Sequence, residues 1–130
     1  MSRVEAVRKI FDEWARGDFS STTSTLDEHA LLVIHDDFPD WGLYLGLEQI
    51  AGYMRGLLGG FSEFTMTAEG FLDAGDTVVV QVRQRGVGPA SGIATEIGYS
   101  QLLTFRGDLI VRIESLVDRD RALAMAGLSG

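Results

Sequence analysis

The chain has 130 residues, of which 45% are hydrophobic and 23% charged, a balance typical of a folded domain. This length predicts a single domain over residues 1–130 with one buried core. Eleven basic against nineteen acidic residues give a net charge of −8, and the basic residues are scattered, so we expect no nucleic-acid partner.

Cysteine is absent, which excludes disulfides and cysteine-ligated metals. Residues 1–16 carry charges throughout, unlike the apolar core of a signal peptide. No stretch approaches the ~20 apolar residues of a membrane span, so we expect a cytoplasmic protein with no membrane partner.

A capping box opens the first predicted helix, with Ser2 followed by Glu5. Apolar residues then recur at helical spacing until Arg16 and Gly17 end the run. These residues are Val4, Val7, Ile10, Phe11 and Trp14. The next segment, 18–27, contains a Ser/Thr run with weak helix propensity and predicts only a short helical turn.

A continuous apolar run over 30–35 predicts the first strand, and 36–40 ends it with turn-forming residues. A loop with three aromatic side chains follows, those of Phe38, Trp41 and Tyr44. One apolar face over 47–58 then predicts a second long helix, which ends at Gly59 and Gly60.

The remaining chain changes to the period of strands, joined by short turns, which predicts an antiparallel sheet. The four predicted strands are 64–72, 77–85, 93–105 and 109–117. The third is long enough that we expect a bend or bulge near Gly98. A last short helix is predicted through Ala126, with Asp118 as its cap. Helices first and long strands afterwards are typical of an α+β fold.

This order of elements resembles the SnoaL-like branch of the nuclear transport factor 2-like superfamily. The segments that resemble it are 11–18, 46–50, 73–80 and the tail 113–128. The resemblance implies a cone-shaped, strongly curved antiparallel sheet wrapped around the N-terminal helices, with an internal apolar pocket, often in a homodimer. It implies no particular reaction, because this fold hosts isomerases, dehydratases, cyclases, epoxide hydrolases and non-catalytic proteins.

Two aspartates are the candidates for a general base. The resemblance places the base of a ketosteroid isomerase at Asp36 or Asp37, but it places that enzyme's two oxyanion donors at Ile10 and Gln101, which argues against steroid isomerisation. Partial burial would raise an aspartate pKa toward working pH, and the neighbouring His35 could share a proton with either carboxylate. The alternative is a solvated turn beside a histidine bonded to backbone. Three adjacent ligands converge poorly on one ion, so we expect no metal and no cofactor.

Strand alternation predicts the pocket wall once Gln101 is taken as facing inward. The candidate ligand-binding residues are Val82, Gln84, Tyr99, Gln101 and Ser115 on the strands, Trp14 and Tyr53 on the helices, and Trp41 in the loop. A few polar groups in an apolar wall are typical of a site for a small apolar molecule.

Three functions fit this sequence. The first is an acid–base enzyme, as a lyase, isomerase or cyclase, in which an aspartate abstracts a proton and Tyr99 with Gln101 holds the polarised group. The second is a non-catalytic protein that binds an apolar ligand. The third is an interaction protein whose outer sheet face, with Val79 and Leu102, forms a homodimer.

Overall fold

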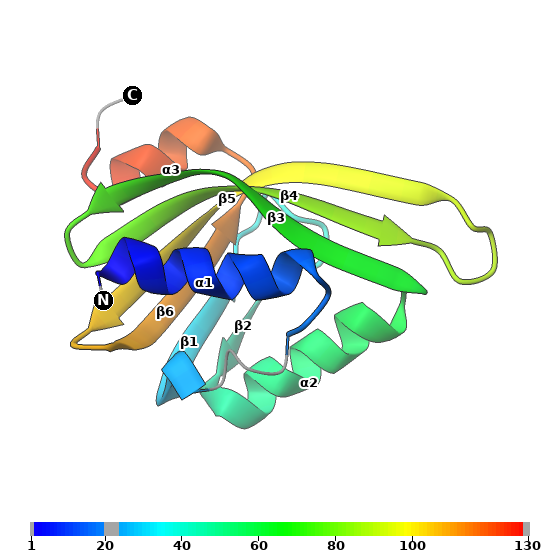
Figure 1. Cartoon of the computed structure of the whole chain (residues 1–130), viewed down its shortest axis with the longest axis horizontal. Helices are drawn as coiled ribbons and strands as arrows, with labels where there is room; N and C mark the ends of the chain where they lie inside the picture. The colour runs from blue at the N-terminus through cyan, green and yellow to red at the C-terminus, as the bar shows by residue number, and fades with distance from the viewer. Residues whose placement is uncertain (1, 20–23, 129–130) are drawn as a thin grey trace.

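The protein is described by a computed structural model that covers residues 2–19 and 24–128. Three helices and six strands follow one another along these residues (Figure 1). In chain order they are α1 (Arg3–Ala15), β1 (Leu26–Ile34), β2 (Gly42–Leu45), α2 (Gly46–Gly59), β3 (Glu63–Ala74), β4 (Thr77–Val87), β5 (Ala94–Arg106), β6 (Leu109–Leu116) and α3 (Arg119–Met125).

The six strands form one curved sheet in the order β2-β1-β6-β5-β4-β3. All neighbouring strands are antiparallel except β1 and β6, which run parallel. Helix α1 lies in the concave side of the sheet and packs mainly on β3, while α2 packs against β1 and β2 (Figure 1). The α+β class and the curved sheet around the N-terminal helices are therefore confirmed.

Local sequence signals account for the ends of the elements. Ser2 Oγ accepts a hydrogen bond from the Glu5 backbone N–H at 3.1 Å, and Asp118 Oδ1 accepts one from the Arg121 N–H at 3.1 Å, so both predicted helix caps form. The β3–β4 and β5–β6 turns each contain a glycine at positive φ, 78° at Gly75 and 62° at Gly107. A residue with a Cβ is strained in that conformation, which explains glycine at both turns.

Four details differ from the sequence expectation. Strand β1 begins at Leu26, within the predicted helical turn 18–27, part of which lies outside the described residues. Strand β2 was expected to be loop, and it forms by pairing with β1. The β4–β5 register passes Gly98 without a shift, and the sheet irregularities lie elsewhere, for example between Ala68 and Gly70. One strand pair is parallel.

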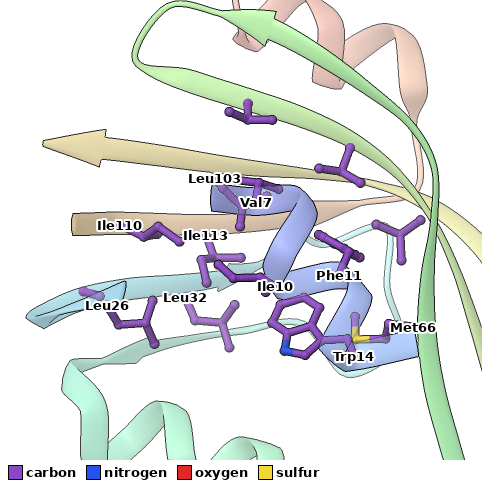
Figure 2. Close-up of a cluster of buried hydrophobic side chains, with 14 of the residues drawn as sticks. Val7, Ile10, Phe11, Trp14, Leu26, Leu32, Met66, Leu103, Ile110 and Ile113 are labelled. Atoms are coloured by element: carbon purple, nitrogen blue, oxygen red, sulfur yellow. The ribbon is translucent and has the colours of Figure 1, made fainter. Parts of the chain in front are cut away.

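The main core lies between α1 and the concave face of the sheet. Figure 2 shows Val7, Ile10, Phe11 and Trp14 on α1 among side chains from the strands. Leu103 on β5 is fully buried in this cluster. The α1 side chains named here are those of the predicted apolar face, so the 3.6-residue period identified the buried side of this helix correctly.

The outer face of the sheet is covered where an interface was expected. Val79 and Leu102 are 1% and 2% exposed and form a second cluster with Leu123 on α3 of the same chain. The prediction that these two residues form a dimer surface is wrong, because α3 already buries them. A homodimer formed in another way stays a prediction.

Within the described ranges, no helix combines the length and the apolar character that crossing a membrane requires.

Candidate ligand-binding cavity

A partly open cavity of about 500 Å³ lies between α2, the end of α1 and the concave face of the sheet. Its wall is mostly apolar. The lining residues are Trp14, Gly17, Asp18, Phe19, Leu26, Leu32, Ile34, Leu47, Ile50, Ala51, Tyr53, Met54, Arg55, Leu57, Leu58, Met66, Gln84, Tyr99, Gln101, Ile113 and Ser115. This volume lies within the ~300–1,000 Å³ typical of small-molecule sites.

The helical side of the cavity was not predicted as ligand-lining beyond Trp14 and Tyr53. Leu47, Ala51 and Met54 lie on the apolar face of α2, which the sequence marked only as a buried helix face. Ile50 is the one buried residue of α2, at 8% exposure. In the structure this apolar helix face is only half-buried, because it lines the cavity.

Four polar side chains of the strands form two hydrogen-bonded pairs in the wall. Tyr99 Oη donates to Gln84 Oε1 at 3.0 Å, and Gln101 Nε2 donates to Ser115 Oγ at 3.4 Å. Gln101 is 3% exposed, and its Oε1 has no hydrogen-bond partner among the described residues. A buried acceptor without a donor costs about 1–3 kcal/mol. Among the described residues, the wall therefore contains one fully buried acceptor without a partner.

Both tyrosines of the wall remain protonated phenols. Burial raises the pKa of Tyr99 well above its ordinary value, with smaller contributions from Tyr53 and Asp40. Burial also raises the pKa of Tyr53. The carboxylate of Asp40 reinforces this shift, because its Oδ2 accepts a hydrogen bond from the Tyr53 hydroxyl at 3.3 Å. Near neutral pH neither phenol supplies a phenolate base.

The structure places Asp36 and Asp37 outside the cavity wall. Asp37 Oδ2 accepts the backbone N–H groups of Val117 and Asp118 at 2.8 and 2.9 Å, which ties the turn after β1 to the chain between β6 and α3. Asp36 is exposed, and its Oδ1 lies 3.4 Å from Arg121 Nη1. Both carboxylates have local partners that account for their positions.

Replacing Asp37 by alanine should lower the free energy of unfolding by about 1–2 kcal/mol, because two backbone N–H groups lose a charged acceptor. Asp36→Ala is the matched control. It removes an exposed ion pair and should change stability by less than ~1 kcal/mol. Urea unfolding of the two variants measures the difference, and equal stabilities would contradict the bridging role of Asp37.

His35 also faces away from the cavity. Its Nε2 lies 3.1 Å from Oε1 of Glu114, a carboxylate that is 6% exposed. The other oxygen of Glu114 lies 3.3 Å from Arg112 Nε. The backbone N–H of His35 donates to the Ser115 carbonyl at 3.0 Å. His35 is thus one of two partners of a buried carboxylate on the outer side of the sheet.

Two further ligand candidates lie off the wall. Val82 is 1% exposed and belongs to the main core, on the same side of β4 as Gln84, but it does not line the cavity. Trp41 is 66% exposed in the loop before β2. The structure brings Trp14, Tyr53, Gln84, Tyr99, Gln101 and Ser115 together around the cavity, as expected.

No cluster of three or more potential metal-ligating histidine or acidic side chains occurs in the part of the chain that the structure describes.

Comparison with known proteins identifies the family to which this fold belongs. A family model described as the SnoaL-like domain matches residues 7–113. The chain belongs to the SnoaL-like domain family. The match runs from the middle of α1 into β6, so it includes nearly all strands of the sheet. No curated protein matches the chain.

Solved structures with the same fold come from several bacteria. A nuclear transport factor 2-like protein from Burkholderia thailandensis aligns with a TM-score of 0.79 and 21% identity over 98% of both chains. A candidate SnoaL-like polyketide cyclase from Jannaschia aligns with a TM-score of 0.74 and 21% identity over 100% of this chain and 96% of that one.

A protein with a ketosteroid isomerase-like fold from Catenulispora acidiphila, solved with trimethylamine, aligns with a TM-score of 0.74 and 19% identity. That alignment covers 98% of this chain and 95% of the other. The TM-scores establish a shared fold, but at these low identities the function has to be argued from the site.

Proposed function

We propose that this SnoaL-like domain binds a small apolar molecule in its internal cavity and pairs one polar group of that molecule with Gln101. The observation that carries the proposal is the unpaired Oε1 of Gln101, which is buried in the wall of a mostly apolar cavity. The terminal torsion of a glutamine is soft, so a small rotation brings Oε1 to a donor of the ligand. The apolar wall supplies affinity by burial, and the amide supplies orientation.

The positions of the ionisable groups favour binding over acid–base catalysis. Of the described lining residues, Asp18 is the one carboxylate, and it is exposed. Asp36, Asp37 and His35, the candidates for proton transfer, lie outside the wall. A general base must reach the proton it removes, at about 2.6–3.2 Å or through one water. Ligand binding needs no such group.

Hexylphenol and hexylbenzene test the proposal, because they differ by one hydroxyl. In Gln101→Met, which keeps the length of the side chain, the affinity for hexylphenol should fall about tenfold and the affinity for hexylbenzene should stay the same. Titration calorimetry measures both. The chain has two tryptophans, so a Trp41→Phe background leaves Trp14 in the cavity wall as a fluorescent reporter.

Gln81→Met is the matched control for this variant. Gln81 lies on β4, faces away from the cavity, and has a buried Nε2 that is also without a partner among the described residues. Its replacement should leave both affinities unchanged. Failure of both probes to bind the unmodified protein would contradict the proposed function.

A further inference from the structure

Four polar side chains form a row across the concave face of three neighbouring strands. Gln84 comes from β4, Tyr99 and Gln101 from β5, and Ser115 from β6. Gln101 lies directly opposite Ser115 in the β5–β6 register, and Tyr99 lies two residues before Gln101 on the same face. All four line the cavity. The middle of the row therefore belongs to the two side chains of β5.

The proton of Tyr99 is already used within the protein. Its hydroxyl points at Gln84 Oε1, 3.0 Å away, and a carbonyl oxygen can only accept. Burial raises the pKa of Tyr99, so the phenol stays protonated and keeps this bond. Toward the cavity, Tyr99 Oη can offer only lone pairs.

Gln101 also offers an acceptor toward a ligand. Its Nε2 donates to Ser115 Oγ, and its Oε1 is the acceptor without a partner among the described residues. The other donors of the row are the second N–H of Gln101 Nε2 and, at the two ends, the Ser115 hydroxyl proton and the Gln84 amide N–H groups. The centre of the row thus offers two acceptors, one from each β5 side chain, beside one amide N–H of Gln101.

We infer that the cavity selects an apolar compound with two hydroxyl donors on one edge, such as an alkylated dihydroxybenzene, which donates to Tyr99 Oη and Gln101 Oε1. This inference rests on the proposed function and adds the ligand class. A ketone or an ester has no donor and leaves both acceptors unpaired.

Four probes with the same carbon skeleton separate the contribution of each hydroxyl donor to the affinity from that of the apolar skeleton. Hexylbenzene has no donor, hexylphenol has one, and hexylresorcinol has two. The difluoro analogue of hexylresorcinol keeps nearly the same shape but has no O–H group. We expect hexylresorcinol to bind the unmodified protein at least about tenfold more tightly than its difluoro analogue in titration calorimetry.

Variants of Tyr99 and Gln101 show how much each acceptor contributes to the preference for hexylresorcinol. In Tyr99→Phe and in Gln101→Met the preference for hexylresorcinol over the difluoro analogue should shrink several-fold. The double variant should bind both compounds equally. Gln81→Met, on the opposite side of the sheet, should keep the full preference.

The possible outcomes distinguish failure of this inference from failure of the proposed function. Equal binding of hexylresorcinol and its difluoro analogue by the unmodified protein would overturn the inference and leave the proposed function intact. Tighter binding of the dimethyl ether of hexylresorcinol than of hexylresorcinol itself would also overturn the inference, because the wall would then act as a donor. If none of the probes binds, hexylbenzene included, the proposed function is contradicted.

Discussion

Replacing Ala51 by tryptophan is expected to lower the affinity for hexylphenol at least about hundredfold while the fold is retained. Ala51 lies on α2, is half-buried and lines the cavity, so a large side chain at this position enters the open space. Enlarging a side chain in a packed core costs about 1–3 kcal/mol, but here the volume of about 500 Å³ is available. Titration calorimetry measures the affinity, and urea unfolding should show a stability equal to that of the unmodified protein or higher.

Ala124→Trp is the control for this change. Ala124 is exposed on α3, on the other side of the sheet, so the same enlargement leaves the cavity free. Its affinity for hexylphenol should equal that of the unmodified protein. If Ala51→Trp folds normally and binds hexylphenol with unchanged affinity, the ligand does not occupy this cavity.

Much of the fold follows from the sequence because its signals are local. The helical period of the first 16 residues and the cap at Ser2 identify α1, and short turns with glycine at positions 75 and 107 delimit the long strands. Strand β2 carries no such signal. It has four residues and exists because it pairs with β1, a contact that only the folded chain brings about.

The candidate site was predictable where side-chain direction is periodic. The resemblance set Gln101 as facing inward, alternation along β5 then placed Tyr99 on the same side, and both line the cavity. The loop after β1 has no period. There the directions of Asp37 and Trp41 follow from tertiary contacts, the former from two backbone N–H groups of the β6–α3 connection. Sequence reasoning therefore placed most of the strand candidates on the cavity wall, with Val82 as the exception, and it wrongly expected Asp37 and Trp41 to reach the cavity.

The burial of Glu114 shows a second feature that strand alternation does not predict. Alternation along β6 puts this residue on the side of the strand opposite Ser115, where a carboxylate is usually solvated. In the structure it is 6% exposed and lies between His35 and Arg112. An ion-pair cluster that joins β6 to the residue after β1 leaves no periodic trace in the sequence.

Replacing His35 by leucine should lower the free energy of unfolding by about 2 kcal/mol. Glu114 would lose the partner of one carboxylate oxygen while staying buried, and a buried charge that loses its hydrogen bond is costly. Arg112 alone compensates poorly, because its guanidinium is half-exposed and contacts the other oxygen. Urea unfolding at neutral pH measures the loss.

The double variant His35→Leu/Glu114→Leu should recover most of that stability, because removing both polar partners leaves no charge to desolvate. The double-mutant cycle should therefore show a coupling of at least about 1 kcal/mol between the two positions, and additive losses would contradict the proposed interaction.

The same double variant separates a stabilising role of His35 from a role in ligand binding. If the histidine only stabilises Glu114, the double variant binds hexylphenol like the unmodified protein, because neither residue lines the cavity. A large loss of affinity with recovered stability would instead connect His35 to the ligand.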